Sequence, residues 1–387
     1  MSGSWRIGTL AGIGVYLHWT FLILLAWVGL THYARGDDFV DAMHGFVFII
    51  ALFGIIVLHE LGHALAARHY GIPTKDITLL PIGGVARLER MPEDPKQELV
   101  VAIAGPLVNV ALAFICAIGI AILAGVSNFD SIMSKGVDDL GFVTEDYQSV
   151  PALSQTALIG TSFLSKMLVV NIILVLFNLL PAFPMDGGRV LRALLAMRMD
   201  YVSATQMAAS VGQGMAILFG LLGLLLNPFL VFIALFVWMG AASEASMVQV
   251  RSGLQGIPVS QAMITQFQSV SPDDRLQDAA SHIIDGFQHD FPVQKDGQLV
   301  GVLTKTDLLR SLATVGADAP VRDVMRDDFE TAAPRDMLQS VFLRLQEGNC
   351  YTLPIIEGDR LVGIITMENI GEYLAIHGAL RKRTAAS

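Results

Sequence analysis

The sequence predicts a polytopic α-helical membrane protein with about six transmembrane helices, followed by a soluble α/β region made of two similar halves. Hydrophobic residues make up 53% of the 387 residues, charged residues make up 16%, and the mean hydropathy is +0.57. Soluble globular chains are far less apolar. After about residue 250 the composition becomes that of an ordinary soluble domain. We therefore assign residues 1–250 to a membrane domain.

Six apolar segments account for the predicted spans. A helix needs about 20 residues to cross a hydrocarbon core of about 30 Å. The segments that meet this length are 10–31, 44–67, 98–125, 157–182, 204–226 and 228–246. Lys and Arg gather in the loops after the second and fourth segments, whereas the loops after the first and third are acidic. The basic loops are therefore expected to be cytoplasmic, with both termini inside.

Charge and cysteine content exclude two kinds of site. The formal net charge is −10, and binding to phosphates needs a concentrated basic surface, so we expect no nucleic-acid partner. The two cysteines differ in their surroundings, because Cys116 lies in an apolar run and Cys350 in a polar region. They suggest neither a disulfide nor a zinc–thiolate site. Any metal is therefore expected to bind to histidine and carboxylate.

The second predicted span contains HELGH, residues 59–63, where a lipid-embedded helix is expected to be apolar. A charged side chain at the bilayer centre costs about 2.5–3.5 kcal/mol on insertion scales, so such residues indicate functional sites. His59, Glu60 and His63 lie in one sector of the helix. This pattern predicts that both imidazoles bind one zinc ion and that Glu60 takes a proton from zinc-bound water.

A catalytic zinc usually has three protein ligands, so a third is expected. The second and fourth spans run in the same direction, and the fourth ends in NLLPAFPMDGGR, where two prolines break the helix. Irregular backbone at membrane depth is tolerated mainly where it lines protein or a wet cavity. Asp186 is the predicted third ligand. Alternatively, it only caps the helix that begins at Gly187.

The third span runs in the opposite direction and contains AGPLVN, which ends at Asn109. Two roles are open for this amide. Asn109 either forms a hydrogen bond with the scissile carbonyl or the developing oxyanion, or satisfies a neighbouring helix.

The soluble region is a duplication. Pro258 aligns with Pro320 and Gly301 with Gly363, and both pairs are 62 positions apart. Each copy is predicted to form a short helix after Pro-Val, a strand, a helix, two strands joined by a turn, and a closing helix. One copy alone is too small to bury a good core, so we expect the two to pack together.

The duplicated pattern resembles a tandem pair of CBS domains, predicted at 257–313 and 320–375, with a basic tail at 376–387. That resemblance implies an adenine nucleotide, ATP or AMP, between the copies, with Thr near phosphate and Asp three residues later on ribose. Thr304 and Asp307 fit this pattern, whereas the second copy has Thr366 and Asn369, which weakens the second site. The alternative is a module that forms a homodimer and binds no ligand.

HELGH, AGPLVN and NLLPAFPMDGGR, in this order on successive spans, resemble the site-2 protease family of intramembrane zinc metalloproteases, in its prokaryotic subgroup with a CBS pair. The resemblance implies peptide hydrolysis within the cell membrane, with zinc as the metal and membrane lipids around the site. The implied substrates are transmembrane or membrane-associated proteins: anti-sigma factors, membrane-tethered transcription factors or signal-peptide remnants. The CBS pair is expected to modulate cleavage.

The segment DITLLPIGGVARLER, residues 76–90, resembles the membrane-associated β-hairpin of that family. An exposed edge there is expected to pair with an extended substrate by strand addition. Gly83 and Gly84 are therefore candidate substrate-binding residues, and the alternative is a plain structural turn.

A function of another class fits some of the same residues. CBS pairs also regulate channels and metal transporters, in which intramembrane His and Asp form an ion path. Glu60 distinguishes the two classes, because a protease needs it as a base and a transporter does not.

Overall fold

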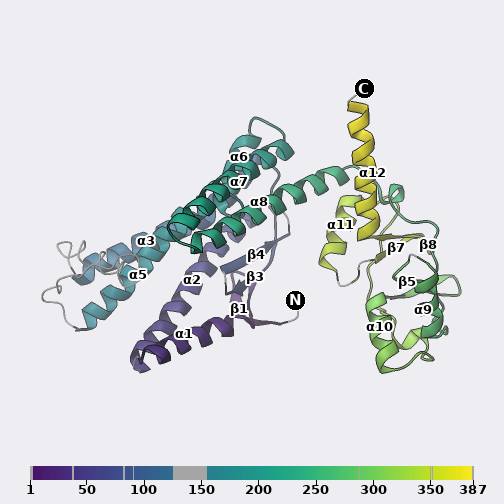
Figure 1. Cartoon of the computed structure of the whole chain (residues 1–387), viewed down its shortest axis with the longest axis horizontal. Helices are drawn as coiled ribbons and strands as arrows, with labels where there is room; N and C mark the ends of the chain where they lie inside the picture. The colour runs from purple at the N-terminus through teal and green to yellow at the C-terminus, as the bar shows by residue number, and fades with distance from the viewer. Residues whose placement is uncertain are drawn as a thin grey trace. The chain divides into compact units, whose positions relative to one another are not determined.

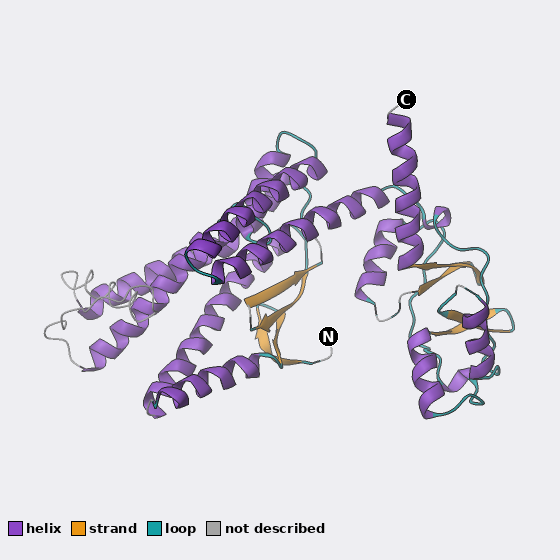
Figure 2. Cartoon of the chain, viewed as in Figure 1, coloured by secondary structure: helices purple, strands orange, loops and turns teal. Residues whose placement is uncertain are grey.

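The computed structural model describes residues 3–36, 39–81, 83–89, 91–124, 155–286, 288–348, 350 and 352–385. The chain divides into two compact units, Met1–Ser246 and Met247–Ser387. Figure 1 labels the helices and strands, and Figure 2 shows that the first unit is mostly helical with one small sheet.

Long apolar helices make up most of the first unit. In chain order, its described helices are α1 (Phe21–Arg35), α2 (Phe39–His69), α3 (Pro95–Ala124), α5 (Gln155–Asn178), α6 (Asp186–Ala196), α7 (Tyr201–Leu225) and α8 (Phe229–Leu254), the last of which crosses the boundary between the units. Among the described residues, five helices are long and apolar enough to cross a membrane: α2, α3, α5, α7 and α8. They coincide with the last five expected spans. The acidic loop expected after the third span falls within residues 125–154, outside the described residues.

The first expected span, 10–31, is wrong in its first half. Strands β1 (Ser4–Leu10) and β2 (Ile13–His18) occupy this region, and α1 follows with 15 residues, fewer than the about 20 that a span needs. Ala11 and Gly12 join the strands with positive φ angles of 50° and 84°, as tight two-residue hairpin turns require. Only His18 and Thr20 interrupt the apolar run from Val15 onward, so hydropathy does not separate its strand from its helix.

The sheet has four strands in the order β1-β2-β3-β4, with β3 at Thr74–Leu80 and β4 at Gly83–Leu88. The hairpin expected from DITLLPIGGVARLER is present as β3 and β4, which pair antiparallel. β2 pairs with β3 in parallel. Val15, Phe53, Val57 and Leu79 are buried together between the sheet and α2, so the sheet is fixed to the helix that carries HELGH.

The second unit contains the duplicated region. Its elements are η2 (Val259–Gln261), α9 (Leu276–Asp285), β5 (Phe291–Lys295), β6 (Gln298–Leu303), α10 (Lys305–Thr314), η3 (Val321–Asp323), α11 (Leu338–Glu347), β7 (Thr352–Glu357), β8 (Arg360–Thr366) and α12 (Met367–Ala385). The strand expected between the short helix and the next helix of each copy is reduced to a single bridge, Val270 with Val293 and Ala332 with Ile355. The basic tail expected at 376–387 continues α12 as far as Ala385.

The two halves pack together, as the duplication predicted. Ile264 of the first half exchanges backbone hydrogen bonds of 2.8 and 3.0 Å with Ile364 of the second. Arg326 of the second half does the same with Val302 of the first, at 2.9 and 3.0 Å. Val321 from the second half is also buried in the core of the first half. Each half therefore contributes residues to the hydrophobic core or the backbone hydrogen bonds of the other half.

Candidate metal centre and CBS cavity

Three side chains from two distant parts of the chain converge beside α3. His59 Nε2 lies 3.2 Å from Asp186 Oδ2, His63 Nε2 lies 3.1 Å from the same oxygen, and the two imidazole nitrogens are 3.1 Å apart. All three side chains are buried. They form the group of potential metal ligands found among the described residues.

The donor set fits a zinc ion. His63 Nδ1 lies 2.7 Å from the carbonyl oxygen of Val101, to which it donates, and in the neutral imidazole this leaves the lone pair of Nε2 to bind a metal. A cation bound by this lone pair and by the Asp186 carboxylate would stabilise both groups. Tetrahedral zinc with bonds of about 2.0–2.1 Å places neighbouring ligand atoms about 3.3–3.4 Å apart. The observed separations of 3.1 to 3.2 Å are close to this value.

Gly105 on α3 leaves the space next to the ligand nitrogens. A Cβ built at this position would lie 2.8 Å from His59 Nε2 and closer still to His63 Nε2. The missing side chain therefore leaves room for an ion and a fourth ligand. The sequence interpretation did not single out Gly105. The available signal was a glycine next to Pro106 within a predicted span.

Asp186 reaches the cluster because the chain turns tightly before it. Asp186 is the first residue of α6, and Met185 occupies the N-cap position without a side-chain cap bond, so the capping alternative does not describe its placement. A Cβ at Gly188 would lie 2.6 Å from the backbone nitrogen of Phe183, and one at Gly187 would overlap the carbonyl oxygen of Leu180. Two glycines therefore let α6 pack directly on the preceding turn.

Glu60 lies beside the cluster, next to strand β4. Its Oε2 accepts a hydrogen bond of 3.1 Å from the backbone N–H of Ala86. Gly84 permits this approach, since a Cβ there would lie 2.7 Å from Ile56 Cγ2 and 3.1 Å from Glu60 Cγ. Gly83 has a φ of 142° and no neighbour within 4 Å of a built Cβ. Strand β4 is an edge strand of the sheet, so one side of it is unpaired within the sheet.

Asn109 lies one turn beyond Gly105 on α3. Its side chain is fully buried, and within the described residues neither amide atom has a hydrogen-bond partner. An unpaired buried amide costs about 1–3 kcal/mol. The alternative role, a hydrogen bond to a neighbouring helix, is therefore not found in this part of the chain.

The predicted nucleotide-binding residues of the first CBS copy cap a helix. Thr304 Oγ1 accepts from the backbone N–H of Asp307 at 3.1 Å and lies 2.7 Å from Asp307 Oδ2. Arg326 Nε donates to the same carboxylate oxygen at 2.5 Å. This hydrogen bond from the guanidinium lowers the pKa of Asp307 below its usual range. In the second copy, Asn369 N–H donates to Thr366 Oγ1 at 3.2 Å in the same way.

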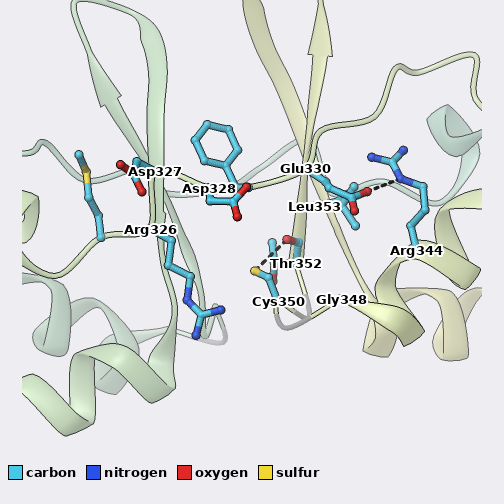
Figure 3. A pocket seen from close by; sticks show the side chains of 11 residues that line it. Arg326, Asp327, Asp328, Glu330, Arg344, Gly348, Cys350, Thr352 and Leu353 are labelled. Carbon is cyan, nitrogen blue, oxygen red and sulfur yellow. Dashed lines mark hydrogen bonds and ion pairs between the residues drawn. The ribbon is translucent and has the colours of Figure 1, made fainter. Parts of the chain in front are cut away.

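A cavity of about 460 Å³ lies next to the Asp307–Arg326 pair. Figure 3 shows Arg326 and Arg344 on opposite sides of this cavity, with Cys350 and Thr352 between them. Arg344 donates to Glu330 at 2.6 Å. Burial raises the pKa of the Cys350 thiol. Arg326 and Arg344 line this cavity, whereas Thr304 and Asp307 are not among its lining residues, and Asp307 is linked to it only through its hydrogen bond with Arg326.

Comparisons with known proteins identify the family. The sequence model described as peptidase family M50 matches residues 47–221, and the CBS domain model matches residues 259–314 and 321–376. A zinc metalloprotease of Methanocaldococcus jannaschii is 33% identical over 378 residues, which is 97% of each chain. Stage IV sporulation protein FB of Bacillus subtilis is 22% identical over 292 residues, 70% of this chain and 90% of the relative.

Among solved structures, the site-2 protease from Methanocaldococcus jannaschii is 33% identical and aligns with a TM-score of 0.40, covering 62% of this chain and 95% of that chain. The named homologues support an intramembrane protease rather than a transporter. The chain belongs to peptidase family M50, the site-2 protease family of intramembrane zinc metalloproteases, and carries a C-terminal pair of CBS domains.

Proposed function

We propose that His59, His63 and Asp186 hold the catalytic zinc and that Glu60 is the general base for peptide hydrolysis within the membrane. The observation that carries this proposal is the convergence of three buried ligand atoms, 3.1 to 3.2 Å apart, against the space left by Gly105. When bound, zinc polarises the substrate carbonyl and activates water for attack.

Two further residues are proposed to act in the reaction, Glu60 in proton transfer and Asn109 in stabilising the oxyanion. Ala86 N–H holds one carboxylate oxygen of Glu60, so the other oxygen is oriented to take the proton from the attacking water and pass it to the leaving amine. The buried Nδ2 of Asn109 donates to the developing oxyanion, which gives this unpaired donor a partner during the reaction.

A transmembrane substrate must be unwound before it is cleaved, since a helix keeps its carbonyls in its own hydrogen bonds. Strand β4 offers backbone groups at the edge of the sheet, next to Glu60. We propose that an extended substrate pairs with this edge near Gly83 and Gly84. The two glycines keep this part of the strand free of bulky side chains.

The substrates belong to the class of membrane proteins, with anti-sigma factors, membrane-tethered transcription factors and signal-peptide remnants as the kinds proposed. The basic loops support our proposal that the active site lies near the cytoplasmic side of the membrane.

The CBS pair is proposed to regulate cleavage by binding ATP or AMP. Guanidinium groups suit phosphate, and Arg326, which contacts Asp307, lines the cavity together with Arg344. A nucleotide shifts the protease between two states only if it binds them with different affinities. The same unit can instead serve as a homodimer contact, and analytical ultracentrifugation with and without nucleotide separates the two roles.

Glu60→Gln tests the catalytic proposal. The variant is expected to keep zinc, measured by metal analysis of the detergent-purified full chain, and to lose cleavage, measured by proteomics of membrane-protein fragments in cells that express each form. Glu89→Gln is the matched control, because this exposed glutamate lies just after β4. Fragments that persist in Glu60→Gln at wild-type levels would show that another group is the base.

A further inference from the structure

A buried ion cluster lies outside the metal ligands and connects three helices. Arg192 on α6 is fully buried, and its Nε donates to Glu98 Oε1 on α3 at 2.7 Å. Its Nη1 donates to Glu244 Oε1 on α8 at 2.5 Å. Glu98 is also fully buried, whereas the side chain of Glu244 is 34% exposed.

Two aromatic rings enclose the same guanidinium. The carbon Cζ of Arg192 lies 5.0 Å from the ring centre of Phe183 and 5.0 Å from that of Tyr201, within the range of cation–π contacts. Phe183 belongs to the turn that leads into Asp186, and Tyr201 is the first residue of α7. Arg192 therefore contacts the segments on both sides of its own helix.

The two helices that position ligands of the proposed metal centre, α6 and α3, both contribute a residue to this cluster. Asp186 is the first residue of the helix that carries Arg192. Glu98 lies three residues before Val101, whose carbonyl accepts the hydrogen bond that orients His63. Arg192 thus links α6, which begins with Asp186, to α3, where the carbonyl of Val101 orients His63.

We propose that Arg192 is a positioning residue for the metal centre: it holds α6 against α3 and thereby sets the separation between Asp186 and His63. This inference rests on the proposed zinc site. A buried ion pair is weak evidence for stability, because apolar groups of similar size often replace such pairs without loss. Arginine is needed here for its geometry: its planar guanidinium bonds Glu98 and Glu244 at once, whereas the ammonium of lysine is a single point charge.

The test compares variants of the full chain in detergent. Arg192→Lys keeps the charge and loses the fork, and the double variant Arg192→Met with Glu98→Leu removes the two fully buried charges. Arg198→Lys, at an exposed position after α6, is the matched control. Ile120→Ala destabilises α3 at a buried site away from the ligands and controls for loss of stability alone. The readouts are zinc affinity by chelator competition, the visible absorption spectrum of the Co²⁺-substituted protein, and kcat and KM for cleavage.

Arg192→Lys is expected to bind zinc about 10-fold to 100-fold more weakly, the range for loss of groups that support metal ligands. Its Co²⁺ spectrum should change, and kcat should fall while KM stays the same. The double variant should recover thermal stability and keep the weak zinc binding. Arg198→Lys and Ile120→Ala should bind zinc as the wild type does, although Ile120→Ala unfolds at a lower temperature.

Wild-type zinc affinity and Co²⁺ spectrum in Arg192→Lys would overturn the inference, as would full recovery of zinc affinity in the double variant. If Arg192→Lys fails to fold, the double variant decides by the same readouts. If the proposed zinc site itself is wrong, the wild-type protein will bind no zinc, which distinguishes that failure from a failure of the role proposed for Arg192.

Discussion

Replacing Gly105 by alanine tests the geometry of the metal centre at its most crowded point. The new Cβ would lie 2.8 Å from His59 Nε2, whereas ordinary contact begins at 3.4 Å, so the imidazole must withdraw by about 0.6 Å. The shift required of His63 is larger, because its Nε2 lies closer to the same point. Both histidines are buried, with 6% and 4% of their residue surfaces exposed, so their rings have little room to move.

These displacements exceed what a metal site accepts. Ligand distances in protein sites agree with the ideal values to within about 0.2 Å. We therefore expect Gly105→Ala to weaken zinc binding by at least about 100-fold, the upper end for loss of supporting groups. Cleavage activity should fall in proportion to the zinc content.

The assay is competition for zinc between the detergent-purified full chain and a chromophoric chelator. Gly214→Ala is the matched control, because this glycine also lies within a long apolar helix and a Cβ built there meets no atom within 4 Å. A Gly105→Ala variant with wild-type zinc affinity and activity would refute the argument that this space belongs to the metal.

Three further changes have distinct expected results. Asn109→Leu should keep zinc and lower kcat by about 10²–10³-fold, as loss of an oxyanion donor does, and an unchanged kcat would assign Asn109 a purely structural role. Gly84→Val should push β4 away from Glu60 and reduce cleavage without loss of zinc, measured by metal analysis beside the cleavage assay; full activity would argue against the hairpin as a substrate contact. Asp307 has a pKa below its ordinary value because of Arg326, so its contribution to stability is present above about pH 4, the unfolded-state value, and is lost as the pH falls through the lower folded-state pKa. Asp307→Asn should therefore cost about 1 kcal/mol of local stability in α10 at pH 7 and progressively less in acid, measured by hydrogen exchange, and a cost that is the same at every pH would contradict this.

The proposed metal ligands and the proposed base could be singled out from the sequence because their signals are local or topological. HELGH carries its own helical spacing, and the parallel direction of two spans brings Asp186 to the depth of His59. The duplication was visible as a constant offset, so the packing of the two halves followed from size alone.

Other features depend on which surfaces meet in three dimensions. Gly105 is one of several glycines in apolar runs, and its role appears only when α3 packs against the face of α2 that carries His63. Arg192 looks like one more basic residue of a cytoplasmic loop until Glu98, 94 positions earlier, is placed beside it. The β1–β2 hairpin was missed for another reason, because hydropathy over a long window outweighs a two-residue turn signal.

The central claim is that Asp186 is a zinc ligand together with His59 and His63. X-ray absorption at the zinc edge of the full-length Asp186→Cys variant tests it directly. The wild type should show nitrogen and oxygen neighbours at about 2.0–2.1 Å, and the variant should gain one sulfur neighbour at about 2.3 Å. A variant that retains zinc with no sulfur in its coordination shell would contradict the account.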